Sequence, residues 1–203
     1  SYADRLYQLP LGVVAIAVGT VLLPDLSRRL RAGDAEGGRA SFNRGTEFAL
    51  FLTIPAAVAL VVIALPLTTV LFQRGAFGAD DAAATALALA IYGAGLPAFV
   101  LHKVFQPLYY AREDTRSPFR FAVWSMVVNA VVAVGLLPLI GFAAAALATT
   151  IAGWTMVFQL WHGTRKMSVE ARFDDRFRRR LPRIIAASLL MGAALWGGTI
   201  ALG

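Results

Sequence analysis

Polar and small residues near the start of the chain share one side of a predicted helix. At 100° per residue, Asp4, Arg5, Gln8 and Gly12 fall within an arc of about 100°. Because polar groups facing lipid are costly, this arc is expected to face a bundle interior or a water-filled cavity. An arginine there can offer two parallel charge-assisted hydrogen bonds to an anionic headgroup. We therefore predict binding of an anionic substrate at Arg5, with Asp4 and Gln8 beside it.

Two residues in the same segment predict that this helix can bend. Pro10 lacks a backbone N–H, so it removes a helix hydrogen bond to the carbonyl near Leu6, and Gly12 follows shortly after. We expect a hinge at Pro10 and Gly12. An arginine at a span boundary can also simply extend its charged end to the membrane interface without binding a ligand, and this alternative for Arg5 stays open.

The sequence contains no pattern typical of a catalytic or metal site. The chain has no Cys, and its two His residues, His102 and His162, have no second ligand at helical spacing. It has no H-E-x-x-H, G-x-S-x-G, Walker A or dinucleotide motif. We therefore predict that the protein is not an enzyme and uses no cofactor or metal.

The composition is that of an all-α, polytopic integral membrane protein. Of 203 residues, 58% are hydrophobic and only 15% are charged, whereas soluble domains carry about 25% charged residues. The net charge of +7 could suggest a nucleic-acid partner, but the mean hydropathy of +0.66 argues against one. Six segments are long and apolar enough to cross a bilayer, at 6–24, 48–72, 82–102, 121–139, 142–162 and 184–203.

The basic residues alternate between the connections of these spans. Connections 25–47, 103–120 and 163–183 contain 17 of the 19 Lys and Arg residues, and the other connections contain 2. Since basic connections tend to stay in the cytoplasm, we place these three there and both visible ends outside.

Several local patterns carry further expectations. The turn signal from Pro138 to Gly141 divides one long apolar run into a helical hairpin. Gly33, Gly37 and Gly38 predict a flexible connector between the first two spans. Phe173 and Phe177, four residues apart among arginines, suit a short helix in the headgroup layer. For the charge itself we favour a topology-setting basic loop with no specific ligand over lipid-specific binding.

Small and polar residues inside the spans predict helix packing. We expect close approach of neighbouring helices at four glycines, and hydrogen bonds between helices from three polar residues. The glycines are Gly93, Gly95, Gly192 and Gly197, and the polar residues are Ser125, Asn129 and Gln159.

Specific strings occur in a fixed order along the first half of the chain. They are Tyr2–Leu6, Gln8–Gly12, Leu22–Arg28, Leu71–Phe77, Tyr92 with Gly95–Phe99, Lys103–Val104 with Pro107, and Tyr110–Pro118. In order and spacing, these strings resemble the lipid II flippase family, MurJ or MviN. From Phe121 onward the resemblance is mainly one of hydropathy and loop length.

The resemblance implies a fold of about fourteen helices in two lobes, as in the multidrug/oligosaccharidyl-lipid/polysaccharide exporter superfamily. The six spans would form most of the second lobe, as helices eight to thirteen of a longer chain. The implied function is alternating-access transport of the lipid-linked peptidoglycan precursor lipid II across the bacterial cytoplasmic membrane, for cell-wall synthesis. Arg5 matches an arginine that holds the diphosphate, and Asp4 the acidic residue beside it. Some members carry an acidic residue where this chain has Gln8.

The implied partners are the diphosphate sugar-peptide substrate, membrane lipids, the N-terminal lobe of the same chain and, where transport is ion-coupled, a coupling ion. Nucleic acid is not among them. Two alternatives stay open. One is a flippase for another polyprenyl-linked glycan, or a cation-coupled exporter of the same superfamily. The other is a membrane scaffold for cell-wall assembly that moves nothing, for which Arg5→Ala would leave growth intact.

Overall fold

The protein is all-α over the residues that its computed structural model describes, which are 12, 16, 21–72, 78–141, 143–165, 167 and 171–202. Those residues contain no β-strand and form helices α2 to α8. Five of these helices are long and apolar enough to cross a membrane, namely α3, α5, α6, α7 and α8. The bounds are α2 Leu23–Arg31, α3 Ala35–Val62, α4 Ala64–Phe72, α5 Ala79–Tyr110, α6 Arg116–Ile140, α7 Ala143–Thr164 and α8 Asp175–Leu202. The prediction of an all-α membrane protein is therefore confirmed.

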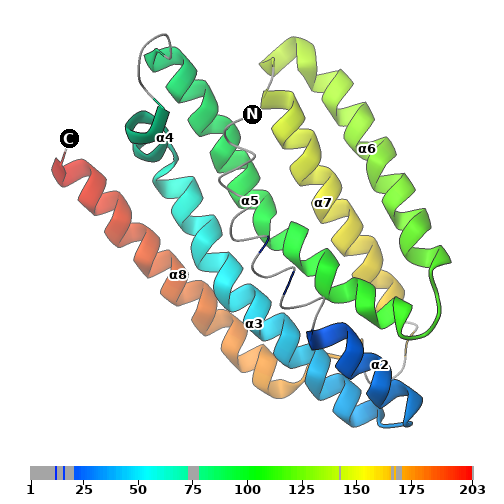
Figure 1. Ribbon diagram of the computed structural model, residues 1–203. Coiled ribbons are helices and arrows are strands. Elements are labelled where there is room, and N and C mark those ends of the chain that lie inside the picture. Colours follow the sequence, from blue (N-terminus) through cyan, green and yellow to red (C-terminus); the bar gives the residue numbers. More distant parts are fainter. Residues whose placement is uncertain are drawn as a thin grey trace.

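The long helices lie side by side in an order that differs from their order in the sequence (Figure 1). Helix α5 packs between α3 and α7, α8 packs on the other side of α3, and α6 packs on the other side of α7. Helices α2, α5 and α7 end, and helices α3, α6 and α8 begin, at the same end of the bundle. We call this end, which holds the three arginine-rich connections, the basic end.

At the basic end, three helices begin one or two residues after an aspartate. The carboxylate of each aspartate accepts a hydrogen bond from the backbone N–H three residues later in the sequence. The pairs are Asp34 with the N–H of Gly37 at 2.8 Å, Asp114 with that of Ser117 at 3.0 Å, and Asp174 with that of Phe177 at 2.7 Å. Each bond satisfies a donor that has no partner within its helix, which fixes where the helix starts.

The expected glycine-rich connector is therefore wrong in its extent. Gly37 and Gly38 lie inside α3, because capping by Asp34 starts the helix ahead of them. Only the short turn at 32–34 links α2 to α3, and Gly33 adopts a φ of +73° there. That left-handed conformation is one that glycine adopts readily.

The range 48–72, predicted as one span, contains the end of α3 and the whole of α4. Helix α3 begins well before Phe48 and ends at Val62, with Ile63 between the two helices. Pro66 accounts for the break, since it has no N–H to donate and its ring would clash with the carbonyl of Val62.

The predicted hairpin between the fourth and fifth spans is confirmed. Helix α6 ends at Ile140, Gly141 follows with a φ of +57°, and α7 begins at Ala143. A residue with a side chain would be strained at Gly141, so the turn depends on glycine.

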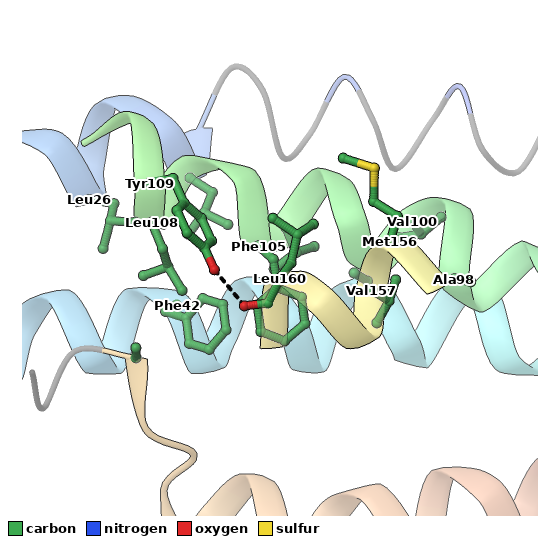
Figure 2. Packing of buried hydrophobic residues seen from close by; sticks show 14 residues of the cluster. Leu26, Phe42, Ala98, Val100, Phe105, Leu108, Tyr109, Met156, Val157 and Leu160 are labelled. Atoms are coloured by element: carbon green, nitrogen blue, oxygen red, sulfur yellow. Dashed lines mark hydrogen bonds between the residues drawn. The ribbon is translucent and has the colours of Figure 1, made fainter. Parts of the chain in front are cut away.

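The main core lies toward the basic end, where α3, α5 and α7 meet (Figure 2). Phe42, Phe105 and Leu160 are almost completely buried there. The Tyr109 hydroxyl donates a 2.6 Å hydrogen bond to the backbone carbonyl of Leu160, which joins α5 to α7 inside this apolar cluster.

The expectation of a separate headgroup-layer helix around Phe173 and Phe177 is wrong. Helix α8 begins at Asp175 and runs on to Leu202, so the basic segment is the start of a long helix. The rings of Phe173 and Phe177 stack with centroids 4.6 Å apart, and Phe173 lies 5.8 Å from Phe42 of the core. The aromatic pair packs toward this core, while the long arginine side chains can extend their guanidinium groups away from it.

Three of the four glycines predicted to allow close packing do so. A Cβ at Gly93 would lie 3.0 Å from the Cβ of Leu60, and one at Gly95 would lie 2.7 Å from the Thr150 hydroxyl. A Cβ at Gly192 would collide with Val58 of α3. Gly197 is the exception, because it is exposed and a Cβ there would meet no described atom within 4 Å.

Candidate functional site

The residues predicted to bind substrate lie outside the described part of the chain, and so does one of the two hinge residues. These are Asp4, Arg5, Gln8 and Pro10. Gly12 is described as a half-buried helical residue, and a Cβ at this position would meet none of the described atoms within 4 Å. The binding and hinge assignments therefore stay predictions.

The cytoplasm-facing end predicted for the first span packs firmly on α3. Leu22 and Leu26 are buried, and a Cβ at Gly45 would come within 2.8 Å of a methyl carbon of Leu22. Leu26 belongs to the main core with residues of α3 and α5. The segment that continues from the polar arc is thus anchored at this end.

Asp25 strengthens the same anchor with charged hydrogen bonds. Its carboxylate accepts bonds from Arg28 Nη2 at 2.8 Å and Arg29 Nε at 2.9 Å, and also from the hydroxyl of Ser41 on α3. The bond from Ser41, followed by those from Arg28 and Arg29, lowers the pKa of Asp25 from 3.8 to about 2. No prediction from the sequence included this group, although the spacing of Asp25 from Arg28 and Arg29 is that of side chains that meet on a helix.

Asn43 fixes the α7–α8 connection to α3. Its Nδ2 donates to the backbone carbonyls of Arg39 at 2.8 Å and Arg172 at 2.9 Å, and its Oδ1 accepts the N–H of Asp174 at 3.0 Å. The side chain is fully buried, and both of its polar atoms are hydrogen-bonded. No sequence pattern marked Asn43, because two of its three partners are backbone groups about 130 residues away.

Ion pairs reinforce this junction. Glu47 of α3, whose side chain is 13% exposed, pairs with Arg176 at 3.5 Å and with Arg180, both on α8. Arg44 lies 3.6 Å from Asp174. The start of α8 is consequently held to α3 by a buried amide and by charges around it.

A cavity of about 580 Å³ opens between α6, α7 and the end of α5. Its lining includes Arg112, Arg120 and His162, which supply cationic or donor groups, and also Asp114. Side-chain and backbone hydrogen bonds with Ser117 hold the pKa of Asp114 below its ordinary value, so this carboxylate is charged near neutral pH.

Of the three polar residues predicted to form hydrogen bonds between helices, one does so among the described residues. Asn129 of α6 donates to the Thr149 hydroxyl of α7 at 3.4 Å, which confirms the prediction for Asn129. The Ser125 hydroxyl and the Gln159 Oε1 are buried and have no hydrogen-bond partner among the described residues, so their predicted bonds are not made there. Ser125 and Asn129 line a cavity of about 310 Å³ with His102.

The chemistry available in this geometry is electrostatic binding. Within the described ranges, no three His, Asp or Glu side chains come together as ligands for one metal ion. Arginines instead gather at one end of an apolar bundle, a distribution that suits contact with anionic groups at a membrane surface.

Comparison with known proteins gives a consistent result. The family model described as "Lipid II flippase MurJ" matches residues 1–202. A probable lipid II flippase MurJ of Rhizobium meliloti (strain 1021) is 47% identical over 195 residues, covering 96% of this chain and 36% of that protein. That of Rhizobium tropici is 43% identical over 194 residues, with the same two coverages.

A solved structure shares the fold. "Lipid II flippase MurJ, inward closed conformation" superposes with a TM-score of 0.80 at 28% identity, covering 95% of this chain and 39% of that one. The chain thus spans little more than a third of the length of the relatives that it matches.

Proposed function

This chain belongs to the lipid II flippase MurJ family, and from that premise we propose that it forms most of the second lobe of a lipid II flippase. The observation that carries the proposal is the family match over residues 1–202, together with a similar arrangement of helices in the solved flippase. The activity is movement of the precursor across the bacterial inner membrane by alternating access, and no covalent bond is made or broken.

In this proposal the first span moves the substrate-binding arc relative to a fixed support. The span's basic end is held on α3 by Leu22 against Gly45 and by the bond between Asp25 and Ser41. Bending at Pro10 and Gly12 would then displace the part of the span that carries Asp4, Arg5 and Gln8. Arg5 would bind the diphosphate through charge-assisted hydrogen bonds, which suit a planar guanidinium better than an ammonium group.

The proposed orientation places the basic end in the cytoplasm and both visible ends outside. The alternation of basic residues supports it, because 17 of 19 Lys and Arg residues lie in three alternate connections. Since the chain contains no Cys, single cysteines placed in it give clean accessibility signals. In a full-length protein without other cysteines, we expect Ala32→Cys, in the exposed turn between α2 and α3, to react with a membrane-impermeant maleimide only after permeabilisation.

Cysteine labelling at the opposite end of the bundle tests the orientation from the other side of the membrane. A cysteine close to the α6–α7 turn, such as Leu139→Cys, is expected to react in intact cells, since Leu139 is exposed at the end opposite the basic one. Leu139 is preferred to Gly141, whose conformation favours glycine. Equal labelling of the two positions in intact cells would refute the orientation.

Growth of cells depleted of their own lipid II flippase tests the function. We expect the full-length protein to restore growth, and Arg5→Ala and Arg5→Lys to fail at normal membrane abundance. Arg179→Ala, which changes an exposed arginine of α8, is the matched control and should rescue. Rescue by Arg5→Ala would make Arg5 an interfacial arginine. Failure of the wild-type protein at normal abundance would contradict the lipid II assignment.

A further inference from the structure

A second cavity at the basic end is rich in arginine. It has a volume of about 480 Å³ and lies between α3, the end of α7 and the start of α8. Arg39, Arg165, Arg172 and Arg178 line it, and Asp175 is the only carboxylate among its described lining residues. The cavity therefore has a local excess of positive charge.

Three of these four arginines have no carboxylate partner in the described part of the protein, and the fourth, Arg39, lies 3.7 Å from Glu36. Arg165, Arg172 and Arg178 form no ion pair with any described carboxylate, whereas Arg176 and Arg180 of the same basic segment both pair with Glu47. Cations that outnumber the carboxylates around a cavity favour an anionic ligand, because their mutual repulsion is relieved when it binds.

The positions of two of these arginines are fixed by neighbouring groups. The guanidinium of Arg39 donates to the backbone carbonyls of Arg172 and Phe173, both at 3.3 Å. The guanidinium of Arg165 lies over the Trp161 ring, 4.3 Å from its centroid. Both contacts hold a cation at the cavity wall before any ligand arrives, which reduces the entropy lost on binding.

An apolar groove of about 290 Å³ adjoins the arginine cavity, and the two share Trp161 and Phe173 in their linings. Residues of α7 and α8 line the two sides of the groove. Helices α3 and α5, which lie between α7 and α8 in the bundle (Figure 1), contribute the residues in the middle. Its other lining residues are Leu50, Leu101, Phe105, Trp154, Val157, Phe158, Phe177 and Leu181. Charge at one end and a continuous apolar surface beyond it match a molecule with an anionic head and a hydrocarbon chain.

We propose that this composite site binds an anionic phospholipid of the leaflet on the basic side, with its phosphate among the arginines and an acyl chain along the groove. The surrounding bilayer supplies such a lipid at the correct depth, since tryptophans and arginines concentrate at the level of the headgroups. The ligand is a lipid of the surrounding leaflet, and its binding does not depend on the proposed transport activity.

The test is lipid binding to the full-length protein in neutral detergent, followed by native mass spectrometry. Phosphatidylglycerol is compared with phosphatidylcholine of the same acyl chains, and we expect about tenfold tighter binding of phosphatidylglycerol. The triple variant Arg165→Gln, Arg172→Gln, Arg178→Gln should remove this preference. The matched control changes Arg31, Arg179 and Arg183 to Gln, which removes the same charge from exposed residues outside the cavity lining, and should keep it.

Each other outcome overturns the proposal. Equal binding of the two lipids would exclude a headgroup site, and equal weakening by the two triple variants would indicate diffuse surface charge. Displacement of phosphatidylglycerol by millimolar inorganic phosphate would identify a soluble anion as the ligand. If the cavity triple variant unfolds, Arg172→Gln alone is compared with Arg179→Gln, with the same expected contrast and the same refutation.

Discussion

The two ends of this bundle are held together in different ways. At the basic end, Asn43, Glu47 and Asp25 connect different helices through hydrogen bonds and ion pairs. Toward the opposite end, the described polar contacts between helices are separate single hydrogen bonds without ion pairs. They run from Thr68 to the carbonyl of Ala82 at 3.2 Å, from Thr150 to that of Ile91 at 3.0 Å, from Trp154 to that of Ala94 at 3.2 Å, and from Asn129 to the Thr149 hydroxyl at 3.4 Å. The rest of that end relies on close approach of small residues such as Gly93.

This difference follows from the solvent that each region meets. Near the headgroups, water competes for the hydrogen-bonding groups of the protein. A polar contact there contributes to stability when it is shielded from water, as that of the fully buried Asn43 is. Deep in the bilayer the lipid tails are as apolar as the side chains, so tight packing is the main specific force between helices. In the proposed function, the basic end is therefore the fixed support from which the first span bends.

The largest effect is expected from breaking the central link at the basic end. Asn43→Leu would leave the N–H of Asp174 without its partner and the carbonyl of Arg172 with only its longer bond from Arg39, and it would place an apolar side chain at the junction. We expect a loss of about 3 kcal/mol in the free energy of unfolding. Thermal unfolding of the full-length protein in detergent measures it. Asn129→Leu, which loses one 3.4 Å bond, is the control and should cost under about 1 kcal/mol, so equal losses would remove the distinction between the two regions.

A smaller effect is expected from the packing contact between α8 and α3. Gly192→Leu would force α8 away from Val58, and overpacking of this kind costs about 2 kcal/mol. Gly197→Leu, on the same helix but facing open space, should be nearly neutral in the same unfolding measurement. A neutral Gly192→Leu would mean that α8 is held mainly by its basic end.

The smallest effect is a pH dependence at Asp25. Its pKa is lowered on folding from 3.8 to about 2, so its contribution is present above pH 3.8 and is lost as the pH falls toward 2. Because the site is near the surface and screened, we expect about 1 kcal/mol. The difference in unfolding temperature between wild type and Asp25→Asn should be seen at pH 6 and disappear near pH 2. A difference that stays constant over that range would exclude this carboxylate as its cause.

Local signals in the sequence predicted the helical class and the hairpin well. Gly141 ends α6 as expected, because a turn between two helices needs a residue that accepts a positive φ. The connector at Gly37 and Gly38 was predicted wrongly because the cap by Asp34 outweighs the low helix propensity of glycine.

Contacts between residues far apart in the sequence could not be predicted from local patterns. The spacing of Phe173 and Phe177 correctly indicated a shared face, but only the position of Phe42 decides whether that face meets lipid or core. Asn43 looked like an ordinary polar residue for the same reason. The substrate contacts predicted for Arg5 rest on helical periodicity and on the family resemblance.

The most direct test of the account measures lipid II on the outer side of the membrane. Cells in which the full-length protein is the only lipid II flippase are treated with an externally added enzyme that cleaves lipid II, and the soluble product is quantified. We expect product with the wild-type protein and with Arg179→Ala, and almost none with Arg5→Ala at equal abundance. Equal amounts of product from wild type and Arg5→Ala would contradict the role of Arg5, and none from wild type would contradict lipid II transport itself.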